Sequence, residues 1–202
     1  MSFAREAGRA VRSTLVLWII TALIYPLMMV AVGQIAFPFQ ANGSILTNAQ
    51  GQPIGSVLIG QPFTSDRYFN SRPSTTRYST AASNADEAKV LQTGVSGASN
   101  LAPSNPDLLK RVQETTAQLN QVNVQPTADL VYTSGSSLDP QITPEAARAQ
   151  IARVARAREL QPNQLEALIS QNTEGRFLGI FGEPGVNVLK LNLALDALKP
   201  AS

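Results

Sequence analysis

A long segment without charge near the N-terminus constrains this chain more than any other feature. Residues 13–65 contain no Asp, Glu, Lys or Arg, and residues 15–36 within them are almost entirely apolar. As a helix that rises about 1.5 Å per residue, the apolar run would be about 33 Å long, enough to cross a hydrocarbon core of about 30 Å. The sequence therefore predicts a transmembrane helix over residues 15–36.

Positive charge is distributed unequally around this predicted helix. Arg5, Arg9 and Arg12 precede it, and the next basic residue is Arg67. Basic residues next to a membrane helix are retained on the cytoplasmic side. We therefore expect residues 1–14 to form a cytoplasmic tail and residues 37–202 to form an extracytoplasmic domain of a single-pass membrane protein.

A cleaved signal peptide is the alternative to a retained anchor. Ala31-Val32-Gly33 would offer a weak cleavage site, but the apolar part of a signal peptide usually spans about 7–15 residues, and this run is longer. Pro26 lies in the middle of the run. A proline there predicts a kink and frees one backbone carbonyl, which favours packing against a neighbouring membrane helix.

The charged and reactive residues exclude several classes of function. The sequence has 16 basic and 14 acidic residues and contains neither histidine nor cysteine. The three N-terminal arginines and Glu6 account for the whole excess of positive charge, so the remaining chain is formally neutral and a nucleic-acid partner is not expected. Without histidine or cysteine, Ser-His-Asp and Cys-His catalysis are excluded, as are imidazole and thiolate metal ligands.

The predicted extracytoplasmic part reads as one mixed domain of the α+β class. Apolar residues on both sides of a polar loop predict a β-hairpin over residues 44–60. Capping residues followed by proline predict helices that begin at Pro106, Pro144 and Pro162. We also expect a last helix over residues 189–198, and short strands at residues 129–132 and 186–188.

Residues 61–83 lack a helical period, and their aromatic side chains should fix this irregular stretch to the core. We interpret the arginines after Pro144 as a solvated surface. Residues expected to face the core are Phe63, Tyr68, Phe69 and Tyr78 in the irregular stretch, and Leu108, Leu109, Val112, Leu119, Ala147, Ile151, Val154, Ala155, Leu165, Leu168 and Ile169 on the helices. The arginines taken as solvated are Arg148, Arg153, Arg156 and Arg158.

No catalytic motif is complete. Gly94-Val95-Ser96-Gly97-Ala98 lacks the final glycine of a nucleophile elbow, and no histidine is present to activate Ser96. A Ser-Lys pair would have to use one of four lysines, Lys89, Lys110, Lys190 or Lys199. Folding would have to bring Asp66, Asp129 and Asp139 together to make a carboxylate site. An anchored carboxylate-dependent enzyme, for example with Asp66 and Asp139, or a binding domain, is the alternative function.

Two segments rich in Ser, Asn, Gly and Pro, residues 96–106 and 134–140, precede predicted helices. Capping and turn formation explain these residue types. Direct binding of a ligand such as a nucleotide by these loops is the other interpretation, and both stay open at this point.

Several strings of residues occur in a fixed order behind the single predicted anchor. They are Leu58-Ile59-Gly60-Gln61 with Phe63, Tyr68-Phe69 with Ser71-Arg72-Pro73-Ser74, Ser99-Asn100-Leu101 with Ser104-Asn105-Pro106, Asp129-Leu130-Val131, Ser134-Gly135-Ser136-Ser137-Leu138-Asp139-Pro140 with Pro144-Glu145-Ala146-Ala147, Gly182-Glu183-Pro184 with Val186-Asn187-Val188, and Leu191-Asn192-Leu193-Ala194-Leu195-Asp196. Through them the chain resembles, over nearly its whole length, the C subunit of the bacterial Kdp-type potassium-transporting P-type ATPase.

The resemblance implies an accessory, non-catalytic subunit of a complex in the bacterial inner membrane that imports potassium at the expense of ATP. The implied partners are a pore-forming potassium-translocating subunit, the P-type ATPase catalytic subunit, a small single-helix subunit and membrane lipid. The family is described as needed for assembly and as a catalytic chaperone that raises the ATP affinity of the ATPase subunit. No catalytic residue, metal ligand or tightly bound cofactor is implied. ATP would act through the complex, with candidate loop contacts at Ser99, Asn100, Ser134, Gly135, Ser136 and Asp139.

Some positions depart from the family pattern. Ala98 and Ser137 stand where glycine is common, Gln141 where histidine often occurs, and Gly185 where arginine is frequent, so a role for that imidazole or guanidinium does not transfer. The predicted topology also conflicts with direct handling of cytoplasmic ATP. We therefore expect the domain to cover the outer mouth of the pore subunit, with the Pro26 helix packed beside that subunit.

Overall fold

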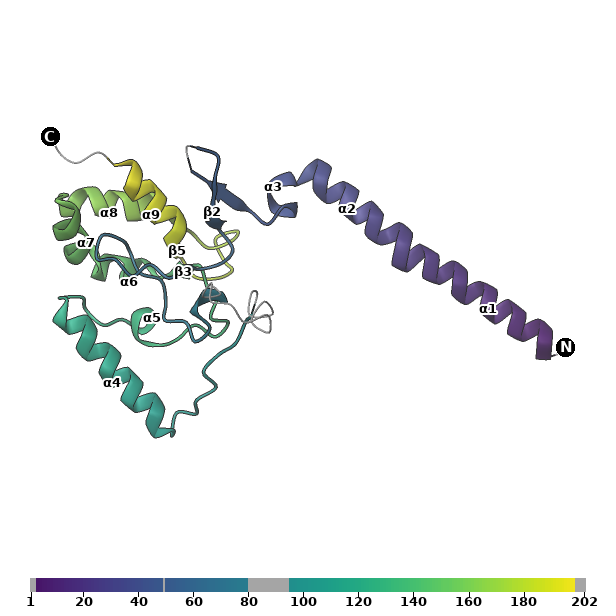
Figure 1. Cartoon of the computed structure of the whole chain (residues 1–202), viewed down its shortest axis with the longest axis horizontal. Helices are drawn as coiled ribbons and strands as arrows, with labels where there is room; N and C mark the ends of the chain where they lie inside the picture. Colours follow the sequence, from purple (N-terminus) through teal and green to yellow (C-terminus); the bar gives the residue numbers. More distant parts are fainter. Residues whose placement is uncertain (1–2, 49, 80–94, 199–202) are drawn as a thin grey trace, which may run out of the picture. The chain divides into compact units, whose positions relative to one another are not determined.

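The structure, a computed structural model, describes residues 3–48, 50–79 and 95–198 (Figure 1). The chain divides into two compact units, Met1–Ile54 and Gly55–Ser202. The described residues exclude the end of the predicted irregular stretch, residues 80–83. They also exclude Lys89, Gly94 and Lys199.

The N-terminal unit begins with a continuous helix of 34 residues, Phe3–Ala36, that is long and apolar enough to cross a membrane. It consists of α1 (Phe3–Ile19), the π-helical turn η1 (Ile20–Ile24) and α2 (Tyr25–Ala36), and none of its residues is buried. The π turn ends at Ile24, two residues before Pro26, and the N–H of Tyr25 donates to the carbonyl of Ile20. A wider turn relieves the clash between the proline ring and the carbonyl four residues earlier.

The chain continues through the short helix α3 (Pro38–Ala41) into a hairpin of β1 (Ile45–Thr47) and β2 (Pro53–Ser56), and the boundary between the two units falls within β2. Asn48 stabilises the turn, because its Oδ1 accepts from the backbone N–H groups of Gln50 (3.0 Å) and Gln52 (2.8 Å). The predicted hairpin is confirmed. Its second strand stops at Ser56, whose carbonyl accepts from the N–H of Ile59 (3.3 Å) and so turns the chain out of the strand.

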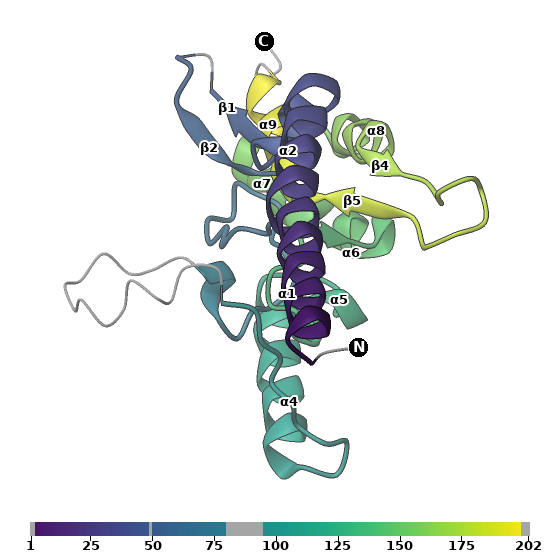
Figure 2. The same ribbon diagram turned by 90° about the vertical axis from the view of Figure 1, so that its right-hand side faces the viewer.

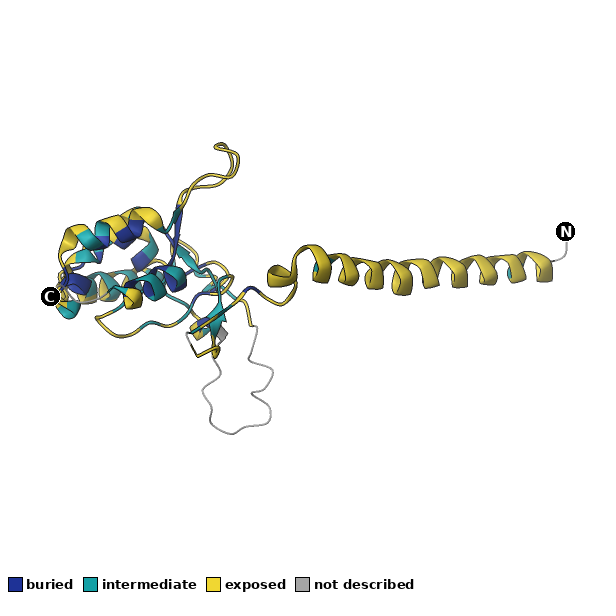
Figure 3. Ribbon diagram, turned by 90° about the horizontal axis from the view of Figure 1, so that it is seen from above, coloured by how far each residue is buried: buried dark blue, intermediate teal, exposed yellow. Residues whose placement is uncertain are grey.

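The second unit contains a small antiparallel sheet with the order β3-β5-β4. Its strands are β3 (Gln141–Ile142), β4 (Thr173–Glu174) and β5 (Gly185–Asn187). Val186 in the central strand faces Ile142 on one side and Thr173 on the other. All of β5 is buried, which agrees with the predicted strand near residues 186–188 to within one residue (Figures 2 and 3).

Four helices enclose the core beside this sheet: α6 (Pro144–Ala149), α7 (Ile151–Arg158), α8 (Pro162–Gln171) and α9 (Val188–Ala197) (Figure 1). The predicted start at Pro144 is confirmed, because Thr143 Oγ1 accepts from the N–H of Ala146 (3.2 Å). The core residues that these elements share are Ile142, Ala146, Ala147, Val154, Ala155, Leu165, Leu168, Ile169, Val186, Val188, Leu191 and Leu195. The apolar stripes predicted from helical periodicity thus form the core, with Ile151 packed at its edge.

Two sequence predictions near α4 (Pro106–Gln121) are wrong. Residues 129–132 are not a strand; they contribute to the single helical turn α5 (Ala128–Val131), in which the consecutive residues Leu130 and Val131 are both buried. The predicted core face of α4 is the second, because no residue of this helix is buried and Leu109 is 60% exposed. Leu108 and Val112 are half-buried, and Leu119 is the residue of this face that packs against the core cluster. The start of α4 is as predicted, with Asn105 Oδ1 accepting from the N–H of Asp107 (2.9 Å).

Candidate functional site

The candidate site is built on Gln61–Tyr78, an irregular stretch that we call the clamped segment. Its last two residues belong to the 3-10 turn η2 (Arg77–Ser79). Phe69 and Tyr78 are buried, and Phe63 and Tyr68 pack against the core cluster. The prediction that aromatic side chains fix this stretch to the core is confirmed for these residues.

Two buried amide side chains grip consecutive residues of the clamped segment. Asn192 of α9 accepts from Phe69 N–H and donates to Phe69 C=O, both at 2.9 Å. Gln150, between α6 and α7, accepts from Asn70 N–H (2.7 Å) and donates to Asn70 C=O (3.1 Å). Each amide replaces the backbone partner that a neighbouring strand would supply, so the segment is satisfied in the interior without belonging to a sheet.

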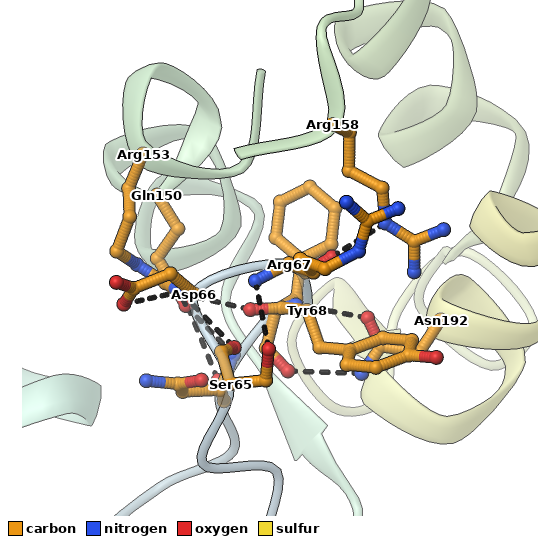
Figure 4. A network of polar contacts seen from close by, with 10 residues as sticks. Ser65, Asp66, Arg67, Tyr68, Gln150, Arg153, Arg158 and Asn192 are labelled. Atoms are coloured by element: carbon orange, nitrogen blue, oxygen red, sulfur yellow. Dashed lines mark hydrogen bonds and ion pairs between the residues drawn. The ribbon is translucent and has the colours of Figure 1, made fainter. Parts of the chain in front are cut away.

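Arg153 of α7 extends this network and contradicts the prediction of a solvated arginine. Its guanidinium donates to the Tyr68 carbonyl (2.9 Å) and to Gln150 Oε1 (2.8 Å), and lies 3.6 Å from the Asp66 carboxylate (Figure 4). Burial lowers the pKa of Arg153, and the Asp66 carboxylate opposes that shift. The side chain is buried because it satisfies carbonyls that the irregular backbone leaves without strand partners.

Arg158 is also poorly described as a solvated arginine. Its Nε donates to the Arg67 carbonyl (2.8 Å), and its Nη2 pairs with Asp196 at 2.6 Å. The guanidinium also lies over the Tyr68 ring, 4.6 Å from the ring centroid. The prediction fits Arg148, which pairs with Glu166 on the surface, and Arg156, which is exposed.

Arg72 pairs with two of the three aspartates that were considered as a carboxylate site, Asp129 and Asp139. Its Nη1 lies 3.7 Å from Asp129 and 3.4 Å from Asp139. Asp129 also accepts from Thr143 N–H (2.7 Å), and Asp139 accepts from Gln141 N–H (3.0 Å). Asp66 pairs with Arg153 instead, so each of the three acids already has a cationic partner.

The two Ser- and Gly-rich segments meet at the far end of the clamped segment. Ser137 is buried, and its Oγ donates to the Gly97 carbonyl (2.5 Å) and accepts from Thr75 N–H (3.0 Å). Ser96 Oγ donates to the Ser136 carbonyl (3.0 Å). Folding therefore brings residues 96–97 and 134–137 together and cross-links them to the clamped segment.

The six residues named as candidate nucleotide contacts differ in their exposure. Ser134 is buried, with its hydroxyl near that of Ser136 (3.2 Å) and accepting from Ser137 N–H (3.1 Å). Gly135 and Ser136 are exposed, and Asp139 is half-buried beside Arg72. Asn100 is exposed in a left-handed conformation with φ 51°, beside half-buried Ser99.

Gly60 lies against this network and leaves no room for a side chain at its position. A Cβ atom at residue 60 would lie 2.5 Å from the Asp139 carbonyl and 2.6 Å from the Tyr78 ring. Tyr78 itself donates its hydroxyl to the Arg72 carbonyl. Burial, with a smaller contribution from the Asp139 carboxylate, raises the pKa of Tyr78 to about 12.

Two departures from the family pattern lie against each other. A Cβ atom at Gly185 would stand 2.9 Å from Gln141 Oε1, so the glutamine side chain occupies the space in which a larger residue 185 would begin. Gln141 Nε2 donates to Glu174 (3.0 Å), which also pairs with Lys190 (2.7 Å). The residues at 141 and 185 are therefore coupled by packing.

A cavity of about 650 Å³ lies between the clamped segment and the second half of α4. Its walls include Asn70, Gln150, Thr115 and Leu119, together with the charged residues Asp66, Arg72, Arg77 and Arg153. Asp66 and Arg153 are paired with each other, and Arg72 is paired with the acids beside the serine loops. Gln150 and Arg153 in this wall hold the backbone of the clamped segment, whereas Asn70 Oδ1 and Arg72 Nε are buried without a hydrogen-bond partner among the described residues.

Gln150 and Asn192 were missed by sequence reasoning. Asn192 could have been found as a lone polar residue within the apolar run Leu191–Leu195. Gln150 offered a weaker signal, because an isolated glutamine between alanine and isoleucine also fits a solvated helix position.

Comparison with known proteins gives a consistent result over the whole chain. The family described as "K+-transporting ATPase, c chain" matches residues 7–197. The chain is 71% identical to "Potassium-transporting ATPase KdpC subunit 1" of Nostoc sp., covering 99% of this chain and 100% of the relative. It is 68% identical to the "KdpC subunit" of Microcystis aeruginosa, over 98% of each chain. It is 44% identical to that of Geobacter sulfurreducens, over 97% of this chain and 100% of the relative.

Replacing Arg153 should destabilise the second unit. We expect Arg153→Ala to lower the free energy of unfolding by about 3 kcal/mol, because the carbonyl of Tyr68 and the amide of Gln150 lose a buried donor. Arg156→Ala, on the exposed side of the same helix, should change it by less than about 0.5 kcal/mol. Urea unfolding of the purified full-length chain measures both, and equal effects would contradict the clamp.

Tyr78 should make stability depend on alkaline pH. Its folded pKa of about 12 exceeds the unfolded value near 10, so the folded chain keeps the proton longer. The resulting stability is complete below pH 10 and is lost as pH rises towards 12, on the order of 1–2 kcal/mol. Tyr78→Phe should flatten this loss in urea titrations between pH 9 and 12, whereas the exposed control Tyr132→Phe should retain it.

Proposed function

The chain belongs to the K+-transporting ATPase c-chain family, and from this premise we propose that it is a single-pass accessory subunit of a bacterial potassium-importing ATPase. In this proposal residues 15–36 anchor it in the inner membrane and residues 37–202 form an extracytoplasmic domain. The observation that carries the proposal is the family match over residues 7–197, which includes both the apolar helix and the folded unit.

Retention of the anchor is supported by its place within the family match. The match begins at residue 7, before the apolar run, so the helix belongs to the region that the family shares. The helix also has 34 residues, more than the apolar part of a signal peptide requires. With Arg5, Arg9 and Arg12 before the run, the N-terminus would be cytoplasmic.

An accessory role without catalysis is supported by the use of the polar groups. Asp66, Asp129 and Asp139 are paired with arginines, and the hydroxyls of Ser134 and Ser137 bind other groups of the protein. These groups hold three irregular segments together, which suits a rigid docking domain. An anchored enzyme that uses Asp66 with Asp139 would first have to break two ion pairs.

We propose that the domain assembles on the outer mouth of the pore-forming subunit, next to the ATPase subunit and the small single-helix subunit. Pro26 and the preceding π turn suit a helix that packs beside another in lipid. The catalytic-chaperone description, with ATP contact near Ser99, Asn100, Ser134, Gly135, Ser136 and Asp139, requires access to cytoplasmic nucleotide. It stays a prediction that competes with this placement.

Thiol labelling tests the placement directly, because the chain has no cysteine. Gln113→Cys lies on the exposed side of α4, and Ala4→Cys lies before the apolar run. In intact cells, a membrane-impermeant maleimide should label the affinity-purified chain at residue 113 and should reach residue 4 only after permeabilisation. The reverse pattern would contradict the extracytoplasmic placement, and absence of residue 4 from the mature chain would indicate a cleaved signal.

Removal of the domain tests its role in the complex. A complex in which residues 44–202 are deleted should assemble poorly or require more potassium for half-maximal uptake in proteoliposomes. The reason is that the anchor alone would still contact the membrane helices of the complex, whereas the outer mouth of the pore-forming subunit would no longer be covered. The matched control carries the full chain with Leu109→Ala, a substitution at an exposed position. Assembly and potassium affinity equal to the control would remove the basis for the proposal.

A further inference from the structure

The connection between β4 and β5 carries a concentrated apolar surface that the fold does not use. Its tip, Phe177–Phe181, exposes the side chains of Phe177, Leu178, Ile180 and Phe181 by 61–73%. Figure 2 shows this connection extending away from the helices of its unit, and it is exposed in Figure 3. Four large apolar side chains gathered at one projecting turn mark an interaction site.

Four of the five backbone N–H groups of this apolar tip donate to carbonyls within residues 176–181. Phe177 N–H donates to Phe181 C=O (2.8 Å), and Phe181 N–H donates back to Phe177 C=O (2.9 Å). Gly179 N–H donates to the Arg176 carbonyl (3.0 Å), and its φ of 75° closes the turn. Each of these internal bonds lowers the cost of stripping water from backbone groups when the turn enters an apolar medium.

Charge is absent from the tip and neutralised at its base. No charged residue lies between Arg176 and Glu183. These two form an ion pair at 2.8 Å, which closes the stem of the turn. The segment thus has an apolar end, which suits the hydrocarbon of a membrane, and a polar base without net charge, which suits the headgroup layer next to it.

We propose that the apolar tip inserts into the outer interface of the membrane that residues 15–36 cross. This proposal rests on the retained anchor of the proposed function. The anchor keeps the domain near the bilayer, since residues 37–44 alone separate α2 from β1, and so raises the effective concentration of lipid at the tip. The apolar side chains of this turn offer a partner protein no hydrogen bonds, whereas protein interfaces carry a polar rim. Insertion into lipid requires apolar side chains and no hydrogen bonds to a partner.

Depth-dependent fluorescence quenching tests the proposal on the full-length chain in phosphatidylcholine vesicles. A nitrobenzoxadiazole label on Ile180→Cys should be quenched at least twofold more by lipid carrying a nitroxide at acyl carbon 5 than a label on Gln113→Cys. Adding Phe177→Ser and Phe181→Ser should reduce quenching at residue 180 to the level of residue 113. Both positions are exposed, and unchanged far-ultraviolet circular dichroism checks that the fold is kept.

A label on Val30→Cys, within α2, separates failure of this inference from failure of the proposed function. Quenching at residue 30 without quenching at residue 180 would overturn lipid insertion of the tip and leave the anchor in place. Lack of quenching at residue 30 would contradict the anchor and the tip together. A blue shift at residue 180 that occurs only in the assembled complex, without nitroxide quenching, would assign the tip to a partner subunit and also overturn the proposal.

Discussion

Hydrogen bonding of irregular backbone by buried side chains is the constraint on which the second unit depends. The clamped segment crosses the core without joining the sheet, yet an unpaired amide or carbonyl in that position would cost more than an ordinary hydrogen bond contributes. Gln150 and Asn192 supply a donor and an acceptor to consecutive residues, and Arg153 satisfies a third carbonyl. The helices that carry these side chains are therefore tied to the segment, and through it to one another.

The internal pairing of polar side chains also bears on function. Arg72 balances Asp129 and Asp139, while Ser137 joins residue 97 to the clamped segment. In an enzyme, some of these groups would be left poised towards a substrate. Here these groups bind one another inside the protein, and this arrangement is one support for the proposed accessory role.

The proposed membrane association gives the remaining features a common physical basis. The N-terminal helix has no charge after Arg12, and its proline is accommodated by a π turn. The apolar tip has a similar property on a smaller scale, because Phe177 and Phe181 pair their backbone groups with each other and the side chains of the tip are apolar. Both elements are unfavourable in water and stable in lipid, since the bilayer rewards internal hydrogen bonding and apolar surface.

The local elements were determined by the sequence alone. The apolar run, the hairpin around Asn48, and the starts of α4 and α6 each depend on residues adjacent in the chain, through helix rise, turn geometry and capping. Tertiary structure decided the rest. Residues 129–132 form a helical turn because Leu130 and Val131 must both enter the core, and Arg153 is buried because a segment about 85 residues away needs its donors. The meeting of residues 97 and 137 likewise arises only on folding. Local propensity acts within a few residues, whereas burial and hydrogen-bond satisfaction are settled between segments that no sequence window contains.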